Sequence, residues 1–171
     1  VRQYGAYPLA FWTNNTEKIR INSTGDIYNK PQTDTYQSTF FGINTGNQLV
    51  STGSYNQSFG YEVAYANTTG EKNTGLGHRS LYNSTTSSRN TAIGYQTLYN
   101  LNNTGSDNTA IGYAAGAGLT NAERNIFVGG FCGASITGGA SVDANSYNTA
   151  LGYHAFRYGN GDQNTAVGYY A

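Results

Sequence analysis

The sequence predicts an all-β protein built as an elongated stack of short repeats. A six-residue pattern recurs eight times, at nearly constant spacing, between residues 38 and 169. The chain contains 23 Gly and 16 Tyr, but only 11% of its residues are charged and its net charge is zero. This composition lacks the apolar bulk of one thick core, and it also lacks the high net charge and low aromatic content of a disordered chain. No stretch repeats apolar residues at helical spacing over three turns, which argues against helices.

The repeat is clearest as Asn-Thr-Ala-Ile-Gly-Tyr at residues 90–95 and 108–113, and it recurs with one change at 148–153 and 164–169. Weaker copies begin at residues 38, 56, 73 and 125. One repeat cannot bury an apolar face alone, so copies of this length are expected to stack as a β-solenoid, each contacting only its neighbours. The structural glycines at the fifth position are Gly42, Gly60, Gly77, Gly94, Gly112, Gly129, Gly152 and Gly168.

Each position of the repeat, compared across the eight copies, leads to its own structural prediction. The fourth position is always apolar, so we expect it to point into the core, with the second and sixth positions on the same face of the strand. The third position is usually small, which suits a surface pressed against another layer. Glycine at the fifth position indicates either a positive φ or an approach too close for a Cβ atom. The leading Asn is a turn residue that can bond its own backbone.

A second short strand is expected after most copies, for example at residues 80–83, 97–100 and 155–158. Each unit would then be strand, turn, short strand and turn. Most steps between copies measure 17 or 18 residues, but the step from Gly129 to Gly152 is 23 residues. The longer step predicts an insertion near residues 135–146 that leaves the stack as a loop.

The first 35 residues do not carry the repeat. Residues 7–13 and 18–22 resemble two strands, and residues 14–17 supply a turn between them. This pattern predicts a β-hairpin region at residues 1–35, followed by the eight-copy solenoid at residues 36–171. Because thin repeats of low hydrophobicity need partners to cover their faces, we expect the shaft to assemble as a homotrimer.

Several classes of function are disfavoured by the composition. Nine basic and nine acidic residues balance, which removes the electrostatic footprint of a nucleic-acid binder. No stretch approaches the roughly 20 apolar residues of a membrane span, so no membrane insertion is expected. Cys132 is the single cysteine, and we expect it to be a small buried filler. His78 and His154 lie in different repeats, and the carboxylates are spread along the chain. The sequence therefore predicts no metal site, no cofactor and no catalytic pair.

The repeat, together with the following Gln-Thr-Leu-Tyr-Asn at residues 96–100 and the opening at residues 11–25, resembles phage tail fibre proteins. It resembles the fibre region that is often followed by an intramolecular chaperone. More distantly, it resembles the head repeats of trimeric autotransporter adhesins, although those repeats are typically shorter. The resemblance implies a homotrimer that contacts a host cell surface as part of a virion, or alternatively on the surface of a bacterium. A polysaccharide-degrading tailspike enzyme is a third hypothesis.

The aromatic residues fall into two groups. Those at the sixth position, such as Tyr95 and Tyr113, form a regular column and are expected to stack as a ladder. Irregular aromatics are better candidates for contact with a receptor, either a host cell-surface glycan or an outer-membrane protein. Phe156, Arg157 and Tyr158 combine two rings and a guanidinium beside a glycine-rich turn, a mixture suited to stacking on sugars and bonding their hydroxyls. The predicted receptor-binding residues are these three and Phe131; Trp12 is a weaker candidate.

Overall fold

The computed structural model describes residues 9–13, 16–21, 27–29, 38–49, 53–134, 146–159 and 161–171. Every element in these ranges is a β-strand, which confirms the all-β prediction. The N-terminal part forms a three-stranded antiparallel sheet of β1 (Leu9–Thr13), β2 (Thr16–Ile21) and β3 (Ile27–Asn29), in that order. The β1–β2 pair is the predicted hairpin, but Thr16 and Glu17, which were expected in the turn, belong to β2 and pair with Thr13 and Trp12. The strand β3 was not predicted. The expected domain boundary at residue 35 lies outside the described residues.

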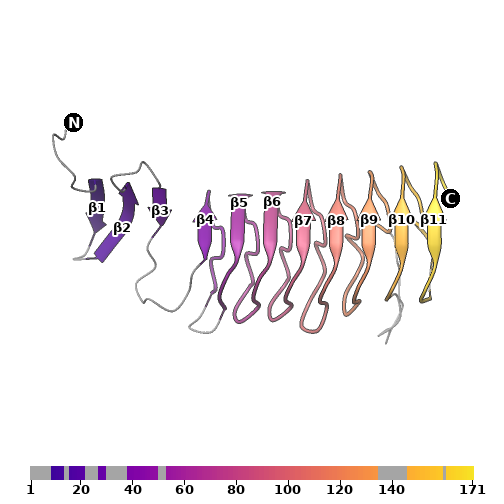
Figure 1. Ribbon diagram of the computed structural model, residues 1–171, viewed down its shortest axis with the longest axis horizontal. Helices are drawn as coiled ribbons and strands as arrows, with labels where there is room; N and C mark the ends of the chain where they lie inside the picture. The colour runs from indigo at the N-terminus through magenta and orange to yellow at the C-terminus, as the bar shows by residue number, and fades with distance from the viewer. Residues whose placement is uncertain are drawn as a thin grey trace.

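The repeats form one parallel sheet in which the strands follow each other in chain order (Figure 1). Equivalent positions pair without a shift, so that Thr91 lies opposite Thr109 and Ala92 opposite Ala110. Each strand belongs to one turn of the chain, and a loop returns to begin the next. This architecture is the predicted β-solenoid. Its strands are β4 (Thr39–Phe41), β5 (Gln57–Tyr61), β6 (Thr74–His78), β7 (Thr91–Ile93), β8 (Thr109–Ile111), β9 (Ile126–Val128), β10 (Thr149–Leu151) and β11 (Thr165–Val167).

The second short strand expected in each unit is absent from the described repeats, where residues 80–83, 97–100 and 155–158 form turns instead. The reason is a backbone pattern that follows each repeat glycine. The residues two and four positions later have left-handed φ, for example 52° at Gln96 and 48° at Leu98. Left-handed residues at every second position interrupt the extended strand. The amide groups still face the next rung, as in the 3.0 Å hydrogen bond that Leu81 N donates to Thr97 O.

Seven of the eight repeat glycines satisfy both conditions that the sequence left open, a positive φ and a close approach to the next rung; Gly168 satisfies only the first. Their φ values lie between 127° and 137°, a region that L side chains rarely adopt. In addition, a Cβ atom on Gly94 would lie 2.1 Å from the carbonyl oxygen of Gly112 in the next rung. The column therefore needs glycine for its backbone conformation and for its close packing along the stack.

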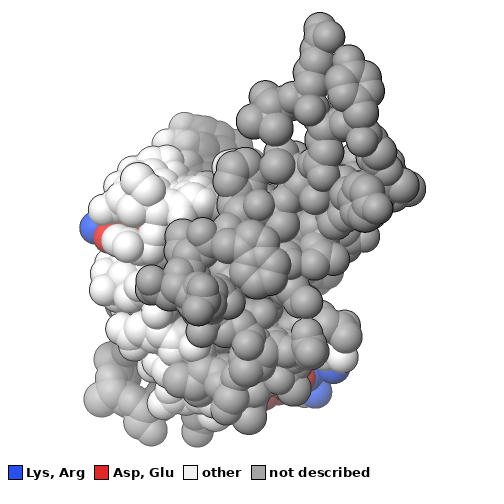
Figure 2. All heavy atoms as spheres, turned by 90° about the vertical axis from the view of Figure 1, so that its left-hand side faces the viewer, with Lys and Arg blue, Asp and Glu red and all other residues white. Residues whose placement is uncertain are grey.

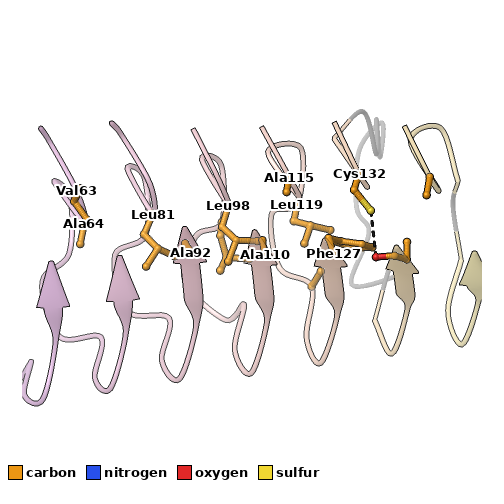
Figure 3. Close-up of a cluster of buried hydrophobic side chains, with 14 residues drawn as sticks. Val63, Ala64, Leu81, Ala92, Leu98, Ala110, Ala115, Leu119, Phe127 and Cys132 are labelled. Atoms are coloured by element: carbon orange, nitrogen blue, oxygen red, sulfur yellow. Dashed lines mark hydrogen bonds between the residues drawn. The ribbon is translucent and has the colours of Figure 1, made fainter. Parts of the chain in front are cut away.

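The core is narrow, and the third position of each repeat points into it. Ala92, Ala110 and Phe127 are fully buried, together with leucines of the turns such as Leu81 and Leu98 (Figure 3). The prediction that the fourth position points inward is wrong, because Phe41, Leu151 and Val167 of that column are 71%, 50% and 65% exposed. The strand is inverted relative to the expectation: small side chains face inward, and large apolar side chains face outward.

Volume compensation explains this inversion. The turn side chains already fill the interior, since a Cβ atom added to Gly75 at the third position would lie 2.4 Å from Cγ1 of Val63. A large residue fits at the third position only where the neighbouring turn residues are glycines, which have no side chain. Phe127 is such a residue, and Cβ atoms on Gly116 and Gly133 would lie 3.3 Å and 2.9 Å from its ring. Because the interior is closely packed, the size of the side chain at the third position depends on the size of the turn side chains beside it.

The leading asparagines form a ladder along the stack rather than isolated turns. The side-chain oxygen of Asn90 accepts bonds from both the backbone N–H and the side-chain amide of Asn108, each at 3.0 Å. The side-chain amide of Asn90 in turn donates to Oδ1 of Asn73 at 3.2 Å and to the carbonyl of Gly105 at 3.0 Å. These asparagines are buried, so the ladder satisfies polar groups that water cannot reach.

We expect Asn90→Ala to lower the free energy of unfolding by more than a surface substitution does. The change leaves the backbone N–H of Asn108 and the carbonyl of Gly105 without partners, at about 1–3 kcal/mol for each unsatisfied group. The side-chain amide of Asn108 keeps its bonds to the carbonyls of Ser106 and Ala122. Denaturant-induced unfolding followed by circular dichroism measures the loss. Asn100→Ala is the matched control, because Asn100 is exposed and accepts one bond from Asn83. Equal losses in the two variants would contradict a role for the ladder in stability.

Candidate functional site

The outward side of the parallel sheet is a regular surface that runs along the repeats. We call it the sheet face, and it consists of the second, fourth and sixth residues of each of the eight copies. None of these residues is Asp, Glu, Lys or Arg. The fourth position forms an apolar row along the stack, exposed at six of the eight copies and half-buried at Ile93 and Val128. The exposed members are Phe41, Phe59, Leu76, Ile111, Leu151 and Val167. An apolar surface of this length is unusual for a chain that is surrounded by water.

The sixth position forms the predicted aromatic ladder over part of the stack. Tyr61, His78, Tyr95 and Tyr113 stack in succession, with ring centroids 5.0–5.1 Å apart. Both faces of His78 and Tyr95 are therefore covered by neighbouring rings, which leaves only their edges for other contacts. The regular stacking ends at the next copy, where the sixth position is Gly130 and carries no side chain.

A second ladder, which was not predicted, runs through the turns. Tyr65, Tyr82 and Tyr99 stack with centroid distances of 5.2 Å. Arg79 lies over Tyr82 at 5.3 Å and forms an ion pair with Glu62 of the preceding rung at 2.7 Å. The signal was present in the sequence, because each of these tyrosines follows a repeat glycine by five residues.

Three of the four predicted receptor-binding residues lie together at the C-terminal end of the stack. The guanidinium carbon of Arg157 is 4.9 Å from the ring centroid of Phe131 and 5.2 Å from that of Tyr158. Phe156 is not part of this group: it is half-buried, packs against the core and stacks on Phe127 at 6.4 Å. The side chain of Trp12 lies outside the part that the structure describes.

His154 completes this group, which we call the Arg157 cluster: Phe131, His154, Arg157 and Tyr158. The imidazole is buried, and its Nδ1 and Nε2 atoms lie 2.7 Å and 3.0 Å from one guanidinium nitrogen of Arg157. Burial and the neighbouring positive charge of Arg157 lower the pKa of His154 below its ordinary value. A neutral imidazole can accept a hydrogen bond from Arg157, so His154 holds the guanidinium in place.

The acidic residues of the described repeats take part in contacts within the stack. Asp107 forms a bidentate ion pair with Arg89 of the preceding rung, at 2.6 Å and 2.9 Å, and these hydrogen bonds lower the pKa of the carboxyl group. Figure 2 shows blue and red spheres beside each other on the visible face. Asp162 accepts a bond from Ser146 N at 2.8 Å. Within the described ranges, no group of three His, Cys, Asp or Glu could hold a metal ion.

Cys132 is a buried core residue, as predicted. Its Sγ atom donates to the carbonyl oxygen of Ala150 at 3.3 Å (Figure 3), and burial raises the pKa of the thiol to about 11. The insertion was predicted near residues 135–146, and residues 135–145 of it lie outside the described residues. Ser146 belongs to the stack again, and its hydroxyl accepts a bond from Glu123 N at 3.0 Å.

The described geometry defines a class of protein: a parallel β-solenoid with a long, uncharged apolar face. No family model matches the chain, and neither a curated protein nor a solved structure matches it. The part of the chain that the structure describes contains no helix long and apolar enough to cross a membrane.

Proposed function

We propose that this chain is a structural, host-surface-contacting and non-catalytic segment of a homotrimeric phage tail fibre. The observation that carries the proposal is the sheet face. Its apolar row is exposed at six of the eight copies in the single chain, and the face contains no charged Asp, Glu, Lys or Arg along eight rungs. Covering this row with apolar surface would remove it from water, which is the main favourable term in protein association.

Another copy of the same chain fits this face better than an unrelated partner does. Equivalent residues of neighbouring rungs lie in register, at the ~4.8 Å spacing of paired strands, so the apolar row is about 34 Å long. An identical copy has the same rung spacing, and its row can therefore meet this row along the whole length. Closed cyclic symmetry limits such an assembly to a fixed number of copies. The number three rests on the resemblance to fibre and adhesin repeats.

The shape of the chain suits a fibre. Rungs that contact only their neighbours extend in one direction (Figure 1), and inter-rung hydrogen bonds and ion pairs give the stack stiffness. Attached to a virion, such a shaft would hold recognition residues at a distance and carry them to the host. The head of a trimeric bacterial surface adhesin would use the same sheet face. A membrane anchor encoded downstream favours the adhesin, and an adjacent chaperone favours the fibre.

Sedimentation equilibrium of the purified chain tests the assembly. We expect a mass three times the 18.3 kDa of one chain. Sedimentation velocity should in addition give the high frictional ratio of an elongated particle. A folded monomer across dilution would refute the homotrimer. Binding of the labelled trimer to a panel of bacterial strains tests host contact. A trimer that binds none of them would reduce the proposal to a spacer, and degradation of host glycan by the trimer would favour the tailspike enzyme.

A further inference from the structure

Arg157 differs from the other arginines whose side chains the structure describes. Arg79, Arg89 and Arg124 each contact a carboxylate, at distances of 2.6–3.1 Å. Arg157 contacts none among the described residues. Its neighbours are instead the rings of Phe131, His154 and Tyr158, and its Nε atom, which is buried, has no hydrogen-bond partner in the described part of the chain. A fixed guanidinium without a counter-ion is a site that can take an anion.

The cluster holds this cation in place before any ligand arrives. The rings of Phe131 and Tyr158 lie 4.9 Å and 5.2 Å from the guanidinium carbon, and His154 contacts one of its nitrogens. Contacts of this kind restrict the rotamers of a long side chain, so less conformational entropy remains to be lost on binding. A planar guanidinium matches the two oxygens of a carboxylate.

The exposed ring beside Arg157 adds a second kind of contact. Tyr158 is 72% exposed, and Gly159 follows it without a side chain. A ring in this position offers an apolar face to the C–H groups of a sugar, while its hydroxyl remains available for hydrogen bonds. The ladder tyrosines cannot offer the same contact, because neighbouring rings cover the faces of residues such as Tyr95. The turn that follows β10 therefore combines a cation with an accessible aromatic ring.

We propose that the Arg157 cluster binds a sugar that carries a carboxylate, such as a uronic or nonulosonic acid, in a glycan of the host surface. The carboxylate bonds the guanidinium of Arg157, and the sugar ring packs on Tyr158. The inference rests on the proposed host-surface contact and names its ligand class. A homotrimer presents the cluster three times, and three linked sites can bind about 10²–10⁴-fold more tightly than one site.

The test compares acidic sugars with their neutral derivatives. The probes are the methyl glycosides of glucuronic acid and of N-acetylneuraminic acid, each with its carboxyl methyl ester, titrated into the purified wild-type protein and followed by NMR. We expect the acids to bind at least tenfold more tightly than the esters, because esterification removes the charge and keeps the ring. Equal binding of acid and ester would overturn the proposal, as would a preference for glucose 6-phosphate or glucose 6-sulfate over the acids.

Variants locate the site. Arg157→Gln should weaken binding of the acids by about 10–100-fold, the usual effect of losing hydrogen bonds to a charged group. Arg89→Gln is the matched control, since it removes an exposed arginine that is paired with Asp107 and should leave sugar binding unchanged. If Arg157→Gln does not fold, Tyr158→Ala tests the same site at an exposed position. Full affinity in a folded variant of either residue would overturn the assignment.

The two proposals can fail separately. A monomer in sedimentation experiments would refute the trimeric fibre, whatever the sugars do. A trimer that attaches to bacterial cells equally well before and after their surface carboxylates are chemically reduced would retain the host contact and would refute the carboxylate ligand.

Discussion

Gly94→Val is expected to lower the melting temperature of the protein more than any other single substitution considered above. The φ of Gly94 is 134°, and a Cβ atom at this residue would lie 2.1 Å from the carbonyl oxygen of Gly112. A β-branched side chain cannot adopt this backbone conformation without strain of about 1–3 kcal/mol per chain. The clash adds to the strain, because neither backbone can move without disturbing the hydrogen bonds between rungs. Differential scanning calorimetry of the variant and the wild type measures the effect.

Gly168→Val separates the effect of backbone strain from the effect of the clash with the next rung. Gly168 belongs to the same column and has a φ of 137°, but a Cβ atom there would meet nothing closer than Cβ of Ala171 at 3.7 Å. This variant should therefore show the backbone strain without the clash, and its melting temperature should fall less. An unchanged melting temperature for Gly94→Val would refute this interpretation of the glycine column. Equal losses in the two variants would show that close packing adds nothing.

If the proposed homotrimer forms through the sheet face, Ile111→Asp is expected to convert it into a monomer. Ile111 lies in the middle of the exposed apolar row of the sheet face. In an assembly that covers this row, each copy would bury a carboxylate without a partner, at a cost of about 3–5 kcal/mol for each charge. The single chain should still fold, since the side chain points away from the core while Ala110 beside it remains buried. Sedimentation equilibrium detects the change in mass, and circular dichroism checks the fold.

Thr120→Asp is the control for this substitution. Thr120 is also exposed, but it lies in the returning loop and does not belong to the sheet face. The Thr120→Asp variant should keep the mass of the proposed homotrimer. A loss of assembly seen only in Ile111→Asp would then be due to where the new charge lies. A trimer that persists in Ile111→Asp would place the interface on another surface.

The candidate site was partly predictable. Phe131 and Arg157 are 26 residues apart, and they meet because the 23-residue step between Gly129 and Gly152 still places their strands next to each other. The sequence suggested Phe131, Arg157 and Tyr158 as receptor-binding candidates but did not place them together, and their role in binding stays a prediction. The sequence did not show that Phe156 belongs to the core. Its left-handed φ of 51° and its position four residues after a repeat glycine, which it shares with Leu98, direct its side chain inward.

The sequence by itself determined the all-β class, the length of each rung and the glycine column, because these features depend on local backbone requirements and on a regular spacing. It did not determine which side of the strand is buried. Alternation along the repeat separates small residues such as Ala92 from large ones such as Ile93, and either set could face inward. Only the tertiary structure decided the matter: leucines of the turns, such as Leu81 and Leu98, fill the interior, and the remaining space admits an alanine. The same packing turns the large apolar row outward and leaves the sheet face for a partner.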